Sequence, residues 1–214
     1  MAFTSFTAGL FTAGQILTAA QMNTFVRDNI MAGGPIYATE ADRTTGIPSP
    51  FEGQRAYITG STETTATGAT SGTAQVPTGI QTIYNGSGWV TVTPVGASAA
   101  GGSNALTTSY ANLTVGGVST TVTLRTGTTA LVSFGGRNLA STNFYSLAVA
   151  VTSTPTVGPN AASILTNNAA LITCGRTFVM TGLTAGLNTF AIQGTANVAG
   201  GTYDLMTLAV QGIA

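Results

Sequence analysis

The sequence has no histidine, no lysine and one cysteine, and only six arginines and six acidic residues among 214 residues. Eight of these charges precede residue 64, so the remainder of the chain carries only Arg125, Arg137, Arg176 and Asp204. An ordinary globular chain is about a quarter charged. Acid–base catalysis needs titratable groups close together, and metal sites need clustered histidine, cysteine or carboxylate ligands. The composition therefore argues against an enzyme and predicts no catalytic residue, metal or cofactor.

Other functions are disfavoured on similar grounds. The formal net charge is zero, which provides no attraction for nucleic acid or an anionic membrane. No apolar run reaches the roughly 18 residues of a membrane-spanning helix. Cys174 has no histidine to act as a base and is expected to be a small buried hydrophobe. Glycan cleavage needs two carboxylates about 5–9.5 Å apart, and only Asp204 follows Glu63.

Threonine takes the place of charge. The chain has 41 threonines, many of them alternating with valine, leucine, alanine and isoleucine. Threonine is β-branched and favours strands, while its hydroxyl hydrates an exposed strand face without charge. We therefore expect an ordered, mainly β protein. Because like-charge repulsion between copies would be weak, we also expect an oligomer or a component of a larger assembly.

Residues 1–34 contain the one helix that the pattern strongly predicts. Thr18 and Gln21 have the spacing of a capping box, and Gly33-Gly34-Pro35 ends the helix. One helical face carries Met22, Phe25, Val26 and Ile30. This apolar face must dock on something. It packs either on the body of its own chain or as an assembly anchor in a neighbouring protein, and the sequence leaves both open.

Residues 35–96 are predicted to form a linker and a β-hairpin. Arg55 to Thr59 has the pattern of a short strand, and residues 61–78 that of a long loop. Two further strands, residues 80–84 and 89–92, flank Asn85-Gly86, which is a strong hairpin signal. Ser87 and Gly88 allow a longer loop instead. A Gly/Ala/Ser run, residues 96–103, resembles a hinge into the last segment.

Two groups of side chains in this middle region are candidate sites. Tyr84 and Trp89 face each other across the hairpin, either as a ligand platform or, as we favour, as a structural cross-strand contact. The acidic residues are expected to be solvated, with Arg43 and Arg55 as candidate partners. They are Glu40, Asp42, Glu52 and Glu63.

Residues 97–214 are predicted to form a β-sandwich or jelly-roll head. Apolar residues recur at every second position in several segments, as a half-buried strand requires. The clearest segments are 118–125, 129–134, 144–152 and 206–210, with Phe190, Ile192 and Val198 continuing the pattern. Glycine-rich turn signals at 116–117, 135–136, 158–159, 182, 186 and 200–201 separate these segments.

Three elements of the chain, made of five short stretches, resemble virion proteins of tailed bacteriophages. Residues 18–30 (TAAQMNTFVRDNI) resemble the opening helix of many such proteins. Residues 51–57 and 84–90, the second reading YNGSGWV, are similar to a strand-and-hairpin element of phage tail and fibre proteins. Residues 181–190 (TGLTAGLNTF) and the final strand resemble the TNF-like jelly roll that ends many phage fibres and spikes.

The resemblance implies a homotrimeric surface appendage of the virion. Its N-terminal region would attach to tail or capsid proteins, and its head would face outward on the extracellular particle. A minor tail or fibre-type protein is the first expectation. A capsid decoration or head-spike protein, or a module that binds a host receptor or carbohydrate, is the alternative. Family heads often carry basic and aromatic residues on their strands, and this head carries few.

Overall fold

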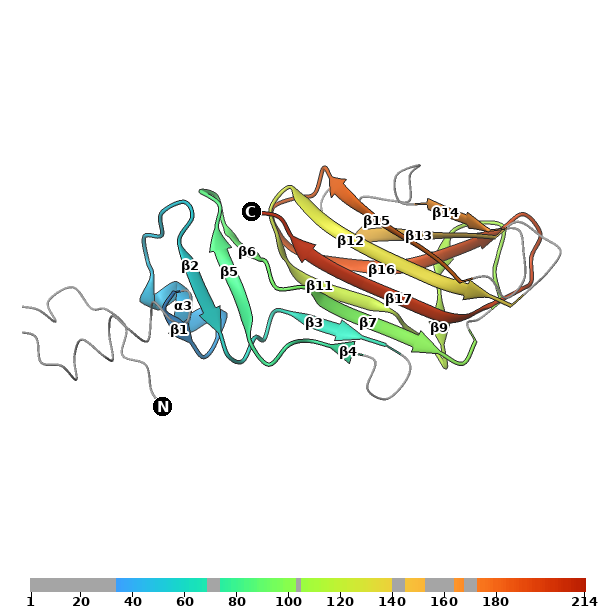
Figure 1. Cartoon of the computed structure of the whole chain (residues 1–214), viewed down its shortest axis with the longest axis horizontal. Helices are drawn as coiled ribbons and strands as arrows, with labels where there is room; N and C mark the ends of the chain where they lie inside the picture. The colour runs from blue at the N-terminus through green and yellow to red at the C-terminus, as the bar shows by residue number, and fades with distance from the viewer. Residues whose placement is uncertain (1–33, 69–73, 103–104, 140–144, 153–163, 168–172) are drawn as a thin grey trace, which may run out of the picture.

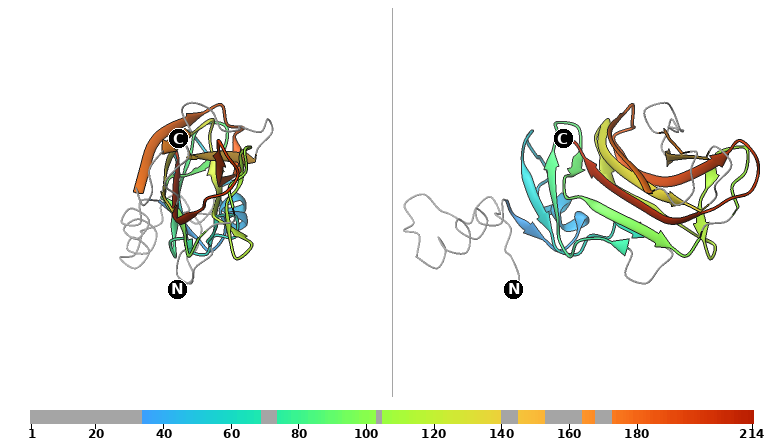
Figure 2. Two further views of the ribbon diagram at one scale, coloured as in Figure 1. Left: turned by 90° about the vertical axis from the view of Figure 1, so that its right-hand side faces the viewer. Right: turned by 45° about the vertical axis from the view of Figure 1, so that its right-hand side comes forward.

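The computed structural model describes residues 34–68, 74–102, 105–139, 145–152, 164–167 and 173–214. A small sheet with one short helix lies at one end of the molecule, and a larger β-sandwich forms the rest (Figures 1 and 2). The fold expected from the sequence, mainly β with a C-terminal sandwich, is thereby confirmed. The proposed anchor, Met22, Phe25, Val26 and Ile30, lies outside the described residues.

The small sheet has the order β1-β2-β5-β6. Its strands are β1 (Ile36–Tyr37), β2 (Arg55–Ile58), β5 (Ile80–Tyr84) and β6 (Trp89–Thr91). Helix α3 (Glu40–Gly46) follows β1 and begins with a capping box, in which Thr39 and Asp42 exchange side-chain-to-backbone hydrogen bonds. This helix was not predicted, although its capping residues, Thr39 and Asp42, can be recognised in the sequence.

Two larger sheets pack face to face. The five-stranded sheet has the order β15-β12-β17-β7-β4, and the six-stranded sheet has β14-β13-β16-β11-β3 with β8 also pairing with β16. The first contains β4 (Ala74–Gln75), β7 (Val95–Ala100), β12 (Thr129–Asn138), β15 (Thr173–Thr181) and β17 (Tyr203–Gly212). The second contains β3 (Thr65–Thr67), β8 (Ala111–Asn112), β11 (Thr121–Thr126), β13 (Tyr145–Thr152), β14 (Ile164–Asn167) and β16 (Gly186–Ala196). A two-stranded ribbon pairs β9 (Thr114–Val115) with β10 (Val118–Ser119).

The core lies between these two sheets and is built from the alternation seen in the sequence. The predicted inward positions of β13 and β17 are buried, as a period of two requires. The largest fully buried side chains of this cluster are Tyr145, Phe190, Leu113, Leu124, Leu147, Ile192, Met206 and Leu208. Val198 departs from the prediction: β16 ends at Ala196, and Val198 in the following loop is 53% exposed.

The hairpin is confirmed and has the longer loop. Tyr84 pairs with Trp89 across β5 and β6. The four-residue loop from Asn85 to Gly88 closes with a hydrogen bond from the Asn85 amide to the Gly88 carbonyl. The Asn85 side-chain oxygen accepts hydrogen bonds from the amides of Ser87 and Gly88. Asn85 therefore stabilises this loop through its side chain, as short Asx turns do.

Two predictions for connecting segments are wrong. The predicted loop 61–78 contributes β3 and β4, which lie at the edges of the two large sheets. The predicted hinge 96–103 is occupied up to Ala100 by β7, which pairs with β17 and buries Ala97 and Ala99. Small residues here fit a crowded sheet, because they pack where larger side chains would not. The proposed domain boundary at 96/97 therefore falls within a strand.

Gly135 and Gly136, predicted to form a turn, lie inside β12. A Cβ atom on Gly136 would lie 2.9 Å from the Leu205 carbonyl oxygen and 2.7 Å from Leu147 Cδ1. A Cβ on Gly135 would lie 2.6 Å from the Cys174 carbonyl oxygen. These glycines are therefore required by close packing and not by a turn.

We expect Gly136→Ala to lower the free energy of unfolding by about 1–3 kcal/mol, because the added methyl overpacks the core against backbone atoms. Gly175→Ala is the matched control, since its Cβ would lie 3.5 Å from the nearest atom, an ordinary contact distance. Chemical denaturation of both variants measures the difference. Equal stabilities of the two variants would contradict the packing explanation.

Candidate functional site

The outward-pointing residues of β7, β12, β15 and β17 form a surface that we call the β12 face. Its middle rows are set by strand register: Gly135 lies between Gly175 and Thr207, and Ser133 lies between Thr177 and Ala209. Ser98 continues the first row beyond Thr207. The face therefore presents small uncharged side chains, and Figure 1 shows its four strands side by side.

A hollow of about 560 Å³ lies in this face. Its outward-pointing lining consists of hydroxyl residues and small or aliphatic residues. These are Gly96, Ser98, Ser133, Gly135, Thr173, Gly175, Thr177, Leu205, Thr207 and Ala209. Arg176 on the edge strand β15 also lines the hollow. The hollow exists because adjacent strands both have glycine at Gly135 and Gly175. Its volume is within the range of small-ligand pockets, roughly 300–1,000 Å³.

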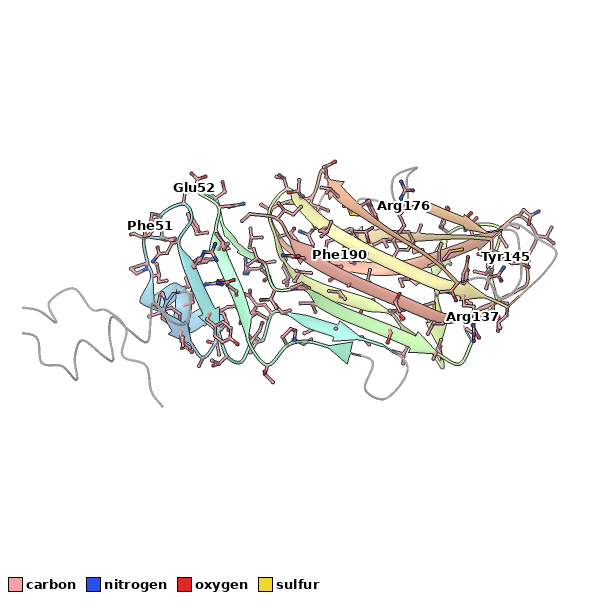
Figure 3. All side chains as sticks on the ribbon, viewed as in Figure 1. Phe51, Glu52, Arg137, Tyr145, Arg176 and Phe190 are labelled. Atoms are coloured by element: carbon pink, nitrogen blue, oxygen red, sulfur yellow. The ribbon has the colours of Figure 1, made fainter. Side chains whose placement is uncertain are left out.

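The β12 face carries an ion pair near the far end of the sandwich, formed by Arg137 on β12 and Asp204 on β17 (Figure 3). Its Nε donates to Asp204 Oδ1 at 2.8 Å, and a second guanidinium nitrogen contacts the other carboxylate oxygen. This hydrogen bonding raises the pKa of Arg137 and lowers that of Asp204. The Asp204 carboxylate is thus held ionised by its partner, which disfavours a role as a catalytic acid.

The outer face of the six-stranded sheet carries a row of threonines. Thr123 on β11 lies in register between Thr65 on β3 and Thr189 on β16, and Thr189 also pairs with Thr152 on β13. The hydroxyls of Thr123 and Thr189 are 2.8 Å apart and share a hydrogen bond. Both sheets of the sandwich therefore present hydroxyl groups outward.

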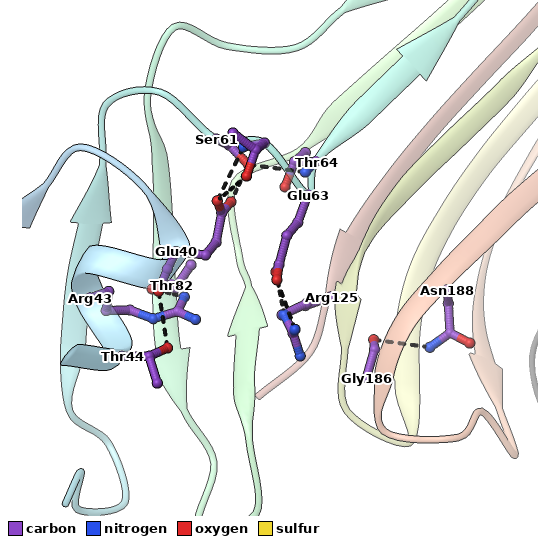
Figure 4. A network of polar contacts seen from close by, with 11 residues as sticks. Glu40, Arg43, Thr44, Ser61, Glu63, Thr64, Thr82, Arg125, Gly186 and Asn188 are labelled. Carbon is purple, nitrogen blue, oxygen red and sulfur yellow. Dashed lines mark hydrogen bonds and ion pairs between the residues drawn. The ribbon is translucent and has the colours of Figure 1, made fainter. Parts of the chain in front are cut away.

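A polar network joins α3 to the segment that leads into the sandwich (Figure 4). Glu40 is 4% exposed and accepts hydrogen bonds from the Ser61 hydroxyl and from the amide and hydroxyl of Thr62. Burial raises the pKa of Glu40, but these hydrogen bonds outweigh it and hold the pKa below its ordinary value. The prediction that Glu40 is solvated is therefore wrong, because α3 directs its side chain against this segment.

Glu63, also expected to be solvated, pairs with Arg125 on β11. The guanidinium binds both carboxylate oxygens, with Nη2 2.8 Å from Oε1. This hydrogen bonding raises the pKa of Arg125. Gln211 on β17 adds a second connection, since its side-chain amide donates to the Val92 carbonyl at 2.8 Å. These contacts hold the small sheet against the end of the sandwich.

Arg43, three residues after Glu40 on α3, is also buried and packs against Trp89. The Arg43 guanidinium carbon lies 4.6 Å from the centre of the Trp89 ring, and Nη1 donates to the Thr82 hydroxyl at 3.4 Å. The Tyr84 ring meets Trp89 edge-on at 5.6 Å. Burial lowers the pKa of Arg43 to about 10, so the cation persists at neutral pH.

The packing around Trp89 decides whether Tyr84 and Trp89 form a ligand platform or a structural cross-strand contact. Trp89 is only 9% exposed and packs with Ile47 and Ala56 in the core of the small sheet. One ring face is occupied by Arg43 and its edge by Tyr84, so Trp89 offers no stacking surface to a ligand. The structural cross-strand interpretation of the pair is confirmed by the strand register.

The remaining candidates are placed as follows. Cys174 is only half-buried, because β15 is an edge strand. Tyr145 and Tyr203 lie in the core. Within the described ranges, no three histidine, cysteine or acidic residues gather as metal ligands. In the same ranges, no helix is long and apolar enough to cross a membrane.

The Glu40 network generates a prediction about pH. A lowered folded-state pKa means that stabilisation is complete above the ordinary glutamate pKa, about 4.3, and is lost as pH falls through the folded value. We expect a melting temperature that is nearly constant from about pH 5 to pH 9 and falls below about pH 4. Glu40→Gln should lower the melting temperature at neutral pH and reduce the acid-induced fall.

Circular dichroism at several pH values measures both effects, with Glu52→Gln as a control because Glu52 is exposed. A melting temperature that shifted by tens of degrees between pH 5 and pH 9 would show that other groups dominate.

Comparisons with known proteins give weak likenesses. No protein-family model matches the chain, and no curated protein matches it. An exo-beta-1,3-galactanase from Phanerochaete chrysosporium, solved with galactose, is 15% identical with a TM-score of 0.28 and covers 60% of this chain. A CBM4 structure is 13% identical with a TM-score of 0.27, and the match covers 56% of this chain and 84% of that one. CBM35 of Cellvibrio japonicus Abf62 is 11% identical with a TM-score of 0.23, and the match covers 70% of this chain and 93% of that one. The match spans 32% of the galactanase. At these TM-scores the likenesses carry no argument about the activity or ligands of this chain.

Proposed function

We propose that this protein is a non-enzymatic structural component of a tailed-phage virion. It acts as a homotrimeric appendage whose N-terminal region attaches to tail or capsid proteins and whose sandwich projects outward. The sequence resemblance at residues 18–30, 51–57, 84–90 and 181–190 supports this proposal. A minor tail or fibre-type position is favoured, with capsid decoration as the competing position.

The observation that carries the proposal is the β12 face, which is nearly free of charge. Its charged side chains are the ion pair of Arg137 on β12 with Asp204 on β17, and Arg176 on β15, which lines the hollow. The rest of the face is uncharged, and a surface of this kind loses few strong interactions with water when it is buried, because there is little charge to desolvate. The face therefore suits permanent contact with another protein surface.

The position of the small sheet fits an attachment role for the segment before it. The described chain enters at Gly34 and continues directly into β1 of the small sheet. Figure 1 shows this sheet at the end of the molecule away from the far loops of the sandwich. An N-terminal anchor would thus hold the small sheet near the particle and direct the sandwich away from it.

We expect light scattering of the full-length protein to give three times the chain mass of 21.4 kDa. Deleting residues 1–34 should leave a folded, still trimeric protein, because the β12 face is retained. A full-length monomer would contradict the trimeric appendage. A trimer that becomes a monomer on deletion would instead make the N-terminal region the oligomerisation element.

A second candidate function is recognition of a host receptor or carbohydrate by the head. The observation that favours it is the hydroxyl-lined hollow, since hydroxyls pair well with neutral polyhydroxy ligands. If this function holds, neutral oligosaccharides bind the full-length protein, and Gly175→Val, which fills the hollow, weakens binding at least about tenfold. Saturation-transfer NMR measures this, with Thr67→Val on the opposite sheet as control. Unchanged binding in Gly175→Val would exclude the hollow as the ligand site.

A further inference from the structure

A second, smaller hollow adjoins the hollow in the β12 face. It measures about 270 Å³, shares the lining residues Gly96 and Ala209 with the first, and is also lined by Val76, Pro77 and Pro94. We propose that the two hollows form one groove, and that this groove binds a neutral, linear oligosaccharide. The inference rests on the second candidate function, recognition of carbohydrate by the head, and specifies the shape and length of the ligand.

The groove runs across the strands and not along them. Its floor is the two middle rows of the β12 face, which pass through Ser133 and Gly135 on β12 and reach Gly96 and Ser98 on β7. The second hollow extends the groove to the segment that follows β4. Five strands about 4.8 Å apart give a length of roughly 19 Å, which accommodates about four sugar units end to end.

Longer side chains bound the floor on both sides. On one side Leu131 lies in register with Gln211, and on the other Arg137 lies in register with Leu205. Gln211 is held by its hydrogen bond to a backbone carbonyl, and Arg137 is held by its ion pair with Asp204. The walls are therefore fixed before a ligand binds, which reduces the cost of ordering the site.

The floor offers hydroxyl groups in place of backbone groups. The backbone amides and carbonyls between β15, β12, β17 and β7 pair in the sheet ladders, so a peptide strand lying across the floor would leave its own backbone groups unpaired. Thr173, Thr177 and Thr207 are exposed and line the hollow. A hydroxyl both donates and accepts hydrogen bonds, as the hydroxyls of a sugar do. This chemistry favours an oligosaccharide over a peptide.

The described residues of the floor carry no charge. Arg176 lines the hollow at β15, but its guanidinium carbon lies 5.9 Å from the ring centre of Phe178, which packs against the core. Strand alternation places Arg176 and Phe178 on one side of β15, and Gly175 and Thr177 on the other. The floor therefore favours a neutral ligand over an acidic or a basic one.

The second hollow gives the groove an apolar end. Pro77, Pro94 and Val76 line it, and the C–H faces of a sugar ring can pack against such side chains. Among the described residues that line the two hollows, the one aromatic residue is Phe134, which is 3% exposed and belongs to the core. Because no aromatic ring stacks on the ligand, we expect a dissociation constant of about 1 mM for short oligosaccharides.

The first test is the dependence of affinity on ligand length. Full-length protein is titrated with malto-, cello-, laminari- and manno-oligosaccharides of one to six units, and binding is followed by saturation-transfer NMR. In at least one series, affinity should rise at least about tenfold from one unit to four and then level off, because the groove is then filled. Equal affinity for one unit and for four would overturn the groove but leave carbohydrate recognition in place. Absence of binding in every series would contradict the second candidate function itself.

Two variants test where the ligand lies. Thr207→Val removes one hydroxyl from the floor with little change of shape and should weaken binding about three- to tenfold. Ala209→Val raises the floor where the two hollows meet, so it should remove the gain in affinity between one unit and four. Thr67→Val, at an exposed position on the opposite sheet, is the control. Unchanged affinities in both groove variants, with unchanged circular dichroism, would overturn the inference.

A second copy of the chain is the competing occupant of the floor. Thr207→Arg places a cation at an exposed position in its middle, and Thr67→Arg places one on the opposite sheet. We expect light scattering to give the wild-type mass for both variants, because the groove must be open. Dissociation of the oligomer in Thr207→Arg alone would show that another copy covers the floor, and would overturn the inference. A monomeric wild type would contradict the proposed homotrimer and leave the groove standing.

Discussion

The apolar layer between the five-stranded and six-stranded sheets is the constraint from which the other features follow. Every strand that contributes to this layer alternates, so each buried residue leaves its neighbours pointing outward. In most proteins those outward positions carry charge. Here they carry threonine, serine, glycine and alanine, and the β12 face is the result. The same alternation that builds the core therefore also determines how the surface meets its surroundings.

The few charged side chains form contacts that join parts of the molecule, more than they solvate its surface. Glu40 and Arg43, three residues apart on α3, are both buried, and Glu63 binds Arg125 where the small sheet meets the sandwich. Burying a charge costs free energy unless partners compensate for lost water. Hydrogen bonds from Ser61 and Thr62 do this for Glu40. The Trp89 ring and the Thr82 hydroxyl do so in part for Arg43, whose buried Nε has no hydrogen-bond partner. The placement of charge thus fixes how the two parts of the molecule are joined.

The scarcity of charge on the surface is compatible with the proposed role as a virion appendage. A surface appendage must remain folded outside the cell and pack permanently against copies of itself, and neither task requires titratable groups. The glycines Gly135 and Gly175 lower the outer surface of the sheet and create the hollow in the β12 face.

Much of the fold could be predicted from local sequence patterns. The sandwich strands and their buried positions, such as those of Leu147 and Leu208, follow from a period of two, which a strand imposes on its own residues. The Asn85–Gly88 loop also follows from local sequence, because the Asn85 side chain accepts a hydrogen bond from within the loop. The capping pair Thr39 and Asp42 can also be recognised in the sequence. The helix that it begins has only seven residues, so its hydrophobic periodicity is too weak to predict it.

Tertiary structure alone decided the rest. Strands β3 and β4 exist because neighbouring strands provide their hydrogen-bonding partners, which a Ser/Thr/Gly/Ala composition does not reveal. The pairing of Glu63 with Arg125 joins residues 62 positions apart, and the hollow requires the register of four strands that are distant in sequence. Alternation is a property of one strand, whereas register and long-range contacts depend on how strands meet. The sequence by itself therefore determined the β character, the core and the neutral surface, while only the folded chain decided where charges pair and where a face lies open.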